Sequence, residues 1–167
     1  MQITIRKFQE DDIPYKVKWI NDTNNNKYLH YDLPLREDKT LQWFKSLDDR
    51  DDRIDYTITY SGKPAGLIGL LNIEFESMEA EYYICLGGEE FRGKGIASIA
   101  TDLLIKKAYK ELNLKKIYLY TEVDNIRAQK LFEKCGFEQE KLLRNNLFYN
   151  GKHVDRYLYI LDVENYL

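Results

Sequence analysis

The stretch best suited to binding chemistry is residues 90–98, EFRGKGIAS, where two glycines and two cations precede a run with helical spacing. The N–H groups in the first turn of a helix have no partner within the helix, and the helix dipole makes that end positive. Glycine lets a ligand approach the backbone closely, and Arg92 and Lys94 add positive charge. The stretch therefore indicates an anion site, for which a pyrophosphate is the natural ligand.

This loop matches neither of the two common nucleotide-binding motifs. It has no G-x-G-x-x-G spacing and no G-x-x-x-x-G-K-[ST] spacing, which counts against a nucleotide-binding regulator. A lone Gly-Lys-Gly is also compatible with an ordinary turn. The loop alone leaves both interpretations open, so the elements around it decide.

The hydrophobic period changes several times along the chain and places the loop between a strand and a helix. The expected elements form the order β-α-α-β-β-β-α-β-α-β-β, which is a mixed sheet with helices on it, an α/β or α+β domain. We predict strands over 3–8, in two runs within 55–75, over 79–86 and 115–123, and around 142–150 and 153–161, with helices over 10–22, 36–47, 93–111 and 124–137.

Two motifs in this order are similar to those of one known family. The loop R-G-K-G-I-A fits the pattern [QR]-x-x-G-x-[GA], and the helix over 124–137 fits N-x-x-A-x-x-[LF]-[YF]-x-x-x-G-F. The chain thus resembles the GNAT family of N-acetyltransferases over nearly its whole length. The matching residues are Arg92, Gly95 and Ala97 in the first motif, and Asn125, Ala128, Leu131, Phe132, Gly136 and Phe137 in the second.

The resemblance implies a single N-acetyltransferase domain over residues 1–167. Its fold would be a mixed, mostly antiparallel central sheet of about seven strands with flanking helices, splayed apart at the cofactor cleft. The segment 19–29 with the later Trp43-Phe44, and the segment 150–159, resemble a branch that includes ribosomal-protein alanine, spermidine and amino-sugar N-acetyltransferases. Family members occur as monomers, dimers and larger assemblies, so a homodimer is among the expected states.

The resemblance also implies acetyl-CoA as cosubstrate and assigns its site. The backbone at Ile84, Cys85 and Leu86 is expected to pair with the pantetheine arm as an added strand. Asn125 and Phe132 are expected at the cofactor wall. Gly87 and Gly88 are expected to absorb one extra residue before the loop as a bulge. The pyrophosphate is expected on the amides of Arg92, Gly93, Lys94, Gly95, Ile96, Ala97 and Ser98.

Acyl transfer to an amine needs a base, because an alkyl amine is mostly protonated at pH 7, and it needs a donor for the leaving thiolate. Glu81 is the candidate base, and Glu122 is a weaker one that is better explained as a carboxylate near a helix N-terminus. The family frequently has tyrosine where this chain has Phe132, which cannot donate a proton. Tyr120 and Tyr83 are candidate substitutes, and solvent or the outgoing ammonium are alternatives.

The acceptor amine is not specified by the motifs. We expect a small molecule of polyamine or amino-sugar type, with a protein or peptide N-terminus as the first alternative and a non-catalytic acyl-CoA-binding module as the second. The aspartates within 48–55 would attract a polycation, although a solvated surface loop is the simpler interpretation. Asp155 and His153 are further candidates for the cleft.

Composition narrows the partners. The net charge of −3 counts against a protein built to hold nucleic acid, and no apolar run approaches the ~18 residues of a membrane helix. The start MQITIRKFQEDD is not typical of a secretory signal. Cys85 and Cys135 form no C-x-x-C pair and are expected to be buried thiols, so we predict no metal site. Together these features predict a cytoplasmic protein without nucleic-acid or membrane partners.

Overall fold

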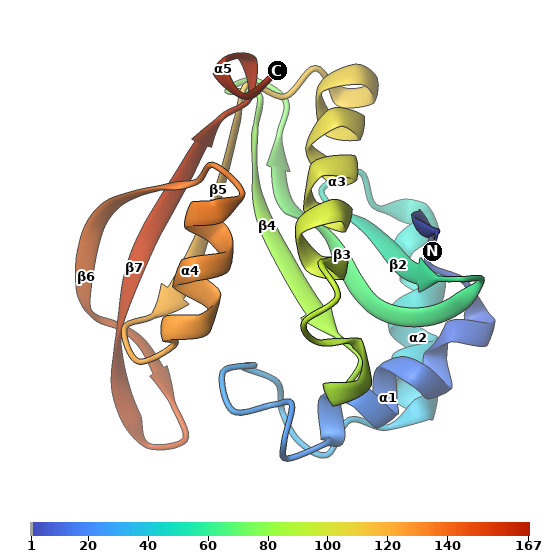
Figure 1. Cartoon of the computed structure of the whole chain (residues 1–167). Coiled ribbons are helices and arrows are strands. Elements are labelled where there is room, and N and C mark those ends of the chain that lie inside the picture. Colours follow the sequence, from blue (N-terminus) through green and yellow to red (C-terminus); the bar gives the residue numbers. More distant parts are fainter. Residues whose placement is uncertain (1) are drawn as a thin grey trace.

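Alternating and helical apolar periods give seven strands and five helices in the part of the chain that the structure, a computed structural model, describes, which is residues 2–167. All seven strands join one sheet (Figure 1). In chain order the elements are β1 (Ile3–Lys7), η1 (Glu10–Asp12), α1 (Ile13–Asn21), α2 (Glu37–Ser46), η2 (Leu47–Asp49), β2 (Ile54–Tyr60), β3 (Lys63–Glu74), β4 (Glu79–Leu86), η3 (Glu89–Phe91), α3 (Ile96–Leu112), β5 (Lys116–Glu122), α4 (Ile126–Lys134), β6 (Glu138–Tyr149), β7 (Lys152–Asp162) and α5 (Val163–Tyr166), where η marks a 3-10 turn.

The sheet has the order β1-β2-β3-β4-β5-β7-β6. Strands β1 to β4 are antiparallel neighbours, with short connections from β2 to β4 and with α1 and α2 between β1 and β2. Strands β5, β7 and β6 form a second antiparallel group. The two groups meet only through the parallel pair β4–β5, which α3 connects. The predicted mixed, mostly antiparallel seven-stranded sheet is therefore confirmed.

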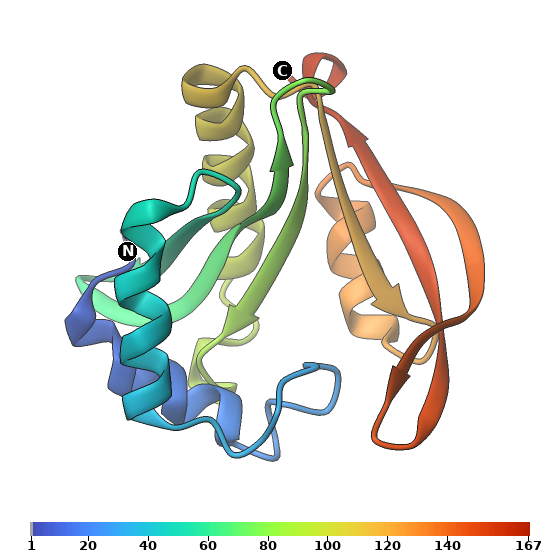
Figure 2. The same ribbon diagram turned by 180° about the vertical axis from the view of Figure 1, so that it is seen from behind.

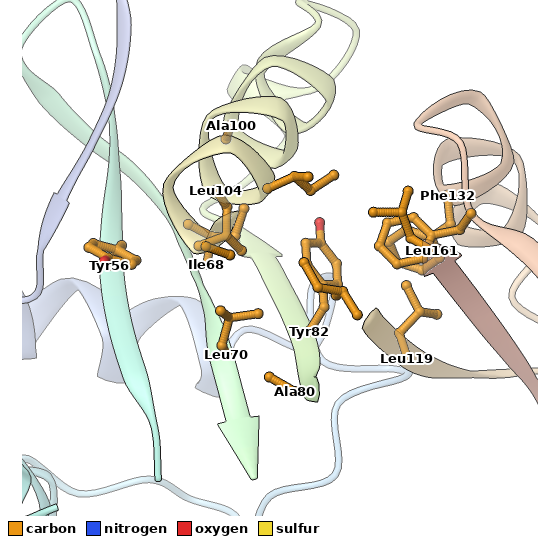
Figure 3. Packing of buried hydrophobic residues seen from close by; sticks show 14 of the residues in the cluster. Tyr56, Ile68, Leu70, Ala80, Tyr82, Ala100, Leu104, Leu119, Phe132 and Leu161 are labelled. Carbon is orange, nitrogen blue, oxygen red and sulfur yellow. The ribbon is translucent and has the colours of Figure 1, made fainter. Parts of the chain in front are cut away.

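The helices cover both faces of the sheet. Figure 1 shows α3 and α4 on one face, and the reverse view in Figure 2 shows α1 and α2 on the other. The larger buried cluster lies on the α3 and α4 side, where Tyr82 of β4 stands between Leu104 of α3 and Phe132 of α4 (Figure 3). A smaller cluster around Trp19 and Ile20 lies under α1 and α2.

Local chemistry explains the two ends of α4. The side chain of Asn125 accepts a hydrogen bond from the N–H of Ala128 at 3.2 Å, so Asn125 is the N-cap that the sequence offered beside Asp124. Gly136 follows the helix with φ +100°, a left-handed conformation that glycine adopts without strain. The expected helix and its end at Gly136 are confirmed.

One local expectation is wrong. The β3–β4 register is continuous from Leu71 opposite Glu81 to Gly66 opposite Leu86, so no bulge absorbs the extra residue before the loop. The chain instead leaves β4 through extended glycines into the 3-10 turn η3. A Cβ on Gly87 would lie 2.6 Å from Cε2 of Trp19, so glycine is required there by the packing of that indole.

Within residues 2–167, no helix is both long and apolar enough to cross a membrane. The same residues contain no group of three or more histidine, cysteine, aspartate or glutamate side chains placed to hold a metal ion.

Candidate active site

The main cavity lies where β4 and β5 diverge. The two strands pair only at three positions, from Glu79 with Lys116 to Glu81 with Tyr118, and then separate (Figure 1). The space between them is a cavity of about 510 Å³, walled by β4, β5, α4, β7 and the segment between α1 and α2. This is the splayed cleft that the sequence predicted.

The remainder of β4 offers a free strand edge to this cavity. Beyond Glu81 no strand within residues 2–167 pairs with β4 on the β5 side, and Ile84, Cys85 and Leu86 line the cavity. An unpaired edge of this kind accepts an extended, amide-containing ligand as an added strand. A pantetheine arm fits this requirement, because it is extended and carries amide groups along its length.

The loop between β4 and α3 has the geometry of an anion site. Gly93 and Gly95 have φ of +73° and +74°, and a Cβ added at either would meet no atom within 4 Å, so this stretch of backbone is open. Among the described residues, no backbone hydrogen bond is donated by the N–H groups of residues 93–98. Three of those amides belong to the first turn of α3, where the helix dipole adds positive potential.

The loop side chains divide between cavity and core. Arg92 and Ala97 line the cavity, and Nη2 of Arg92 lies 3.5 Å from Oδ1 of Asn25. Nε of Arg92 is buried and has no hydrogen-bond partner among the described residues, although it lies 3.2 Å from Oε1 of Glu89, with which it forms an ion pair. Ile96 is 1% exposed and packs in the main core, so this residue offers a ligand only its amide.

Asn125 and Phe132, expected at the cofactor wall, both line the cavity. Asn125 also caps α4, so it positions the wall as well as forming part of it. The ring of Phe132 is 7% exposed and meets Tyr82, Phe137 and Tyr159 edge-on, with centroid separations of 5.7, 6.0 and 6.4 Å. This aromatic cluster makes a rigid apolar floor on the α4 side.

Glu81 occupies the last paired position of β4, at the apex of the divergence. Its Oε1 accepts a hydrogen bond from Nδ2 of Asn72 at 3.1 Å. Burial raises the pKa of the Glu81 carboxyl above its ordinary value, against the opposing effects of that hydrogen bond and of the Arg156 charge. A carboxylate with a raised pKa at the base of a cavity has the property that a general base requires.

Glu122 also lies in the cavity wall. From the sequence alone, Glu122 is better explained as a carboxylate near a helix N-terminus, so this position was not predicted. Its Oε2 lies 2.7 Å from Nε2 of His30, which comes from the segment between α1 and α2. This hydrogen-bonded pair joins opposite walls of the cavity. The ring of His30 also meets Tyr149 of β6 at 5.1 Å, so the segment is held from two sides.

Arg156 of β7 is the other functional candidate that sequence reasoning missed. Its guanidinium lies 4.6 Å from the ring centroid of Tyr120, and its Nε donates to Oδ1 of Asn146 at 2.7 Å. Burial lowers the pKa of Arg156, while the charge of Glu81 acts in the opposite direction. Arg156 reaches the cavity because the register of β7 against β5 sets it opposite Glu122, and this register could not be predicted from the sequence.

The cavity contains four tyrosines, and their hydroxyl groups distinguish them. Tyr83 donates to Oδ1 of Asp55 on the far side of β4, Tyr82 is hydrogen-bonded to Oγ1 of Thr101, and Tyr28 donates to the carbonyl of Asp124. Within residues 2–167, the hydroxyl of Tyr120 has no hydrogen-bond partner. Tyr83 is therefore excluded as a free donor, and Tyr120 is retained.

Other sequence candidates lie elsewhere. Neither Asp155 nor His153 is among the described residues that line the cavity. Asp155 accepts a hydrogen bond from the N–H of Asn145, and the ring of His153 contacts that of Phe148 at a tilt of 55°. The aspartates within 48–55 are also outside it, and two of them pair locally with Arg50 and Arg53. Cys85 lines the cavity, but burial raises the pKa of its thiol to about 11.

Together, the free strand edge, the open amides and the positive loop define the class of protein. They fit an acyl-CoA molecule, with its pyrophosphate at the loop and its pantetheine along β4, and they leave the opposite side of the apex open to a second substrate. The fold and site are those of an acyl-CoA-dependent transferase.

Comparisons with known proteins agree. Residues 2–138 match the family model described as an acetyltransferase (GNAT) domain. A spermidine N(1)-acetyltransferase of Vibrio cholerae is 30% identical over 166 residues, 96% of this chain and 93% of that protein. A ribosomal N-acetyltransferase-like protein of Bacillus subtilis, YdaF, is 34% identical over 110 residues, 65% of this chain and 58% of that protein.

Solved structures give the same result. The structure of spermidine N-acetyltransferase from Vibrio cholerae in complex with CoA and spermine superimposes with a TM-score of 0.89 at 27% identity, covering 99% of this chain and 98% of that one. The chain belongs to the GNAT acetyltransferase family. It is an N-acetyltransferase, and its acyl donor is acetyl-CoA.

A first prediction concerns Phe132. Phe132→Tyr is expected to leave kcat unchanged or raise it, because a hydroxyl there would supply the proton donor that many family members have. In a Tyr120→Phe background, where kcat is expected to fall about 10²-fold, the same change is expected to restore activity. Steady-state kinetics on the four proteins tests this. A large loss in Phe132→Tyr alone would show that the floor requires an apolar ring.

Proposed function

We propose that this enzyme acetylates a primary amine of a polyamine, with spermidine as the first acceptor to test. The observation that carries the proposal is the pair of carboxylates, Glu81 and Glu122, in the cavity wall where the acceptor must enter. One carboxylate serves as base and the second balances a further ammonium of the acceptor. Similarity to spermidine acetyltransferases of Vibrio cholerae and Escherichia coli, the latter 28% identical over 90% of this chain, supports the same acceptor.

In the proposed mechanism, acetyl-CoA supplies the thioester whose acetyl group is transferred. Glu81 takes a proton from the acceptor ammonium, directly or through one water, so that the neutral amine attacks the acetyl carbonyl carbon. The C–N bond forms as the C–S bond breaks. Tyr120 gives its hydroxyl proton to the leaving thiolate, and the newly acylated nitrogen releases its extra proton, which returns to the Tyr120 oxygen through solvent. A backbone N–H of the free β4 edge stabilises the charge that develops on the carbonyl oxygen.

A peptide N-terminus is the second candidate acceptor. Lys27, Arg127 and Arg156 also line the cavity, and such side chains donate to the carbonyl oxygens of a peptide. The likeness to the ribosomal N-acetyltransferase-like protein YdaF supports this alternative. These cations would bind the carbonyl oxygens of a peptide but repel a polyamine. Removing one cation therefore discriminates between the two acceptors.

The experiment is a comparison of kcat/KM for CoA release with spermidine, an amino sugar and an alanine-starting peptide, in wild type and in Arg156→Gln. The proposal expects spermidine to give the highest value and Arg156→Gln to keep or raise it. A peptide preferred over spermidine and lost in Arg156→Gln would establish the second candidate. Acetyl-CoA binding without CoA release from any amine would favour the non-catalytic module.

The pH profile tests the role of Glu81. Because burial raises the pKa of its carboxyl, kcat/KM is expected to rise with pH through a limb that lies above the ordinary glutamate value of about 4.3. The sign follows from the role, since a base acts only when ionised. Glu81→Gln should abolish this limb, whereas a limb unchanged in the variant would assign it to another group.

We also propose that residues 1–167 act as one N-acetyltransferase domain, since strands from both ends of the chain join one sheet.

We propose that the enzyme works in the cytoplasm, where its two free cysteines would remain reduced and acetyl-CoA is present. A homodimer is proposed as its assembly, to be tested by light scattering.

A further inference from the structure

Helices α1 and α2 lie on one face of the sheet (Figure 2). A second cavity, of about 470 Å³, is lined by residues of these helices and of β3 and β4. Its wall is largely apolar and aromatic, with Trp43 of α2, Tyr83 of β4 and Leu71 of β3. It also carries cations, with Lys16 on α1 and Arg53 immediately before β2. None of the residues proposed to act in acetyl transfer lines this cavity.

Lys16 is the unusual residue in this wall. It is 6% exposed, and its Nζ lies 3.5 Å from the ring centroid of Trp43 and 5.8 and 6.0 Å from those of Phe8 and Tyr31. In the described part of the chain, no hydrogen bond or ion pair reaches this Nζ. Aromatic faces compensate a buried ammonium only in part, and buried charges in proteins are normally paired.

The carboxylate that acts on Lys16, Asp55, is already paired with Arg53. Asp55, 5% exposed, accepts two hydrogen bonds from Arg53, at 2.7 and 2.8 Å, and one from the hydroxyl of Tyr83. Asp55 therefore balances Arg53, and the charge of Lys16 remains in excess. Burial lowers the pKa of Lys16 to about 8, so its amine is still mostly protonated at neutral pH.

We propose that this second cavity binds a small organic anion, an apolar or aromatic carboxylate. Its charged group would pair with Nζ of Lys16 and its body would lie against Trp43 and Leu71. The charge of the wall repels a polyamine, so this ligand is distinct from the proposed acceptor. The segment that supplies Tyr31 to this cavity supplies His30 to the first one, so the two sites are joined by adjacent residues.

The test uses benzoate as probe, with benzamide as its uncharged counterpart and inorganic phosphate as an anion without an apolar body. Titration calorimetry at pH 7 is expected to show one benzoate site per chain, with binding about tenfold or more tighter than that of benzamide or phosphate, the gain from one charge-assisted hydrogen bond. The site should persist when CoA is bound. Displacement by CoA, equal binding of all three probes, or no saturable binding would overturn the proposal.

Lys16→Met removes the charge and keeps the length of the side chain, and Lys63→Met at the exposed first position of β3 is the matched control. Benzoate affinity should fall about tenfold or more in the first variant and stay unchanged in the second. Lys16→Met should also melt at a higher temperature, because an unpaired buried charge is removed. Equal benzoate affinity in wild type and a folded Lys16→Met would refute the assignment.

The wild type alone provides an independent test if the variant does not fold. Benzoate binding should weaken as pH rises through about 8, as Lys16 loses its proton. The other titratable groups that line the cavity are Lys39, Arg53, Tyr31 and Tyr83, and burial raises the pKa of Tyr31 to about 12 and that of Tyr83 well above 10. Asp55 and Cys85 act on Lys16 from outside the lining, and burial raises the pKa of the Cys85 thiol to about 11. A benzoate affinity that does not change between pH 7 and pH 9.5 would contradict the role of Lys16.

Discussion

Gly95→Asp is expected to abolish acetyl-CoA binding while the protein stays folded. Gly95 precedes α3 in a left-handed conformation, and a Cβ there would point into open space beside the unbonded amides of the loop. A carboxylate at that point would face the pyrophosphate, and two like charges about 5 Å apart repel by roughly 3 kcal/mol at an effective dielectric constant of about 20. Affinity should therefore fall about 100-fold or more.

Gly95→Asn is the matched control, because asparagine has the shape of aspartate without its charge and also tolerates φ above zero. Its affinity for acetyl-CoA is expected to fall no more than about tenfold, from backbone and steric effects alone. Calorimetry gives the affinities, and thermal melting confirms that both variants fold. If folded Gly95→Asp binds acetyl-CoA as tightly as wild type, the pyrophosphate does not lie at this loop.

Glu81→Gln is expected to lower kcat by about 10²–10⁴-fold, the usual contribution of a positioned general base. Glutamine keeps the volume and the hydrogen bond to Asn72 but cannot accept the proton from the amine. The KM for acetyl-CoA should stay close to that of wild type, because Glu81 lies at the apex and not at the pyrophosphate loop. Steady-state kinetics with both substrates varied measures the two effects.

Glu122→Gln is the comparison for this variant. Its carboxylate is bound to His30, so we expect its loss to raise the KM for the amine more than it lowers kcat. The reverse result, a large kcat loss in Glu122→Gln and a small one in Glu81→Gln, would make Glu122 the base. In that case His30 would be the residue that positions it.

Much of the fold follows from local sequence. The helical period predicted from Gly93, the strand before Gly87 and the cap at Asn125 are set by residues close together in the chain. The strand and the cap appear where expected, and the helix begins three residues later, at Ile96. The two motifs then identify the family, because they occur on the correct elements in the correct order. The sequence therefore predicted the loop, its place before a helix and the strand edge beside the cleft, while the binding of the cofactor by individual loop residues stays a prediction.

The acceptor side was not readable, because it depends on contacts between distant segments. His30 meets Glu122 across 92 residues of sequence, and the segment that carries it has no regular period to predict its path. Arg156 reaches Tyr120 only through strand register, which one residue of shift would reverse. The position of Lys16 near the start of a helix likewise does not indicate that its side chain is buried beside the indole ring of Trp43.

The Phe132 substitution shows how sequence and structure combine. The sequence identifies the missing hydroxyl, since phenylalanine stands where a proton donor is frequent. The structure then removes Tyr83 from the substitutes by its bond to Asp55 and leaves Tyr120 with a free hydroxyl in the cavity. The assignment of Tyr120 as the proton donor therefore depends on the hydrogen bond made by Tyr83 as much as on the position of Tyr120 itself.

The most direct test of the central claim is transfer of a labelled acetyl group. The enzyme is incubated with spermidine and acetyl-CoA carrying carbon-13 in the acetyl group, and the products are analysed by mass spectrometry alongside Glu81→Gln. Our account predicts spermidine bearing one labelled acetyl group on nitrogen, one free CoA for each product, and almost no product from the variant. Acetyl-CoA that binds but leaves spermidine unlabelled, or equal yields from both proteins, would contradict it.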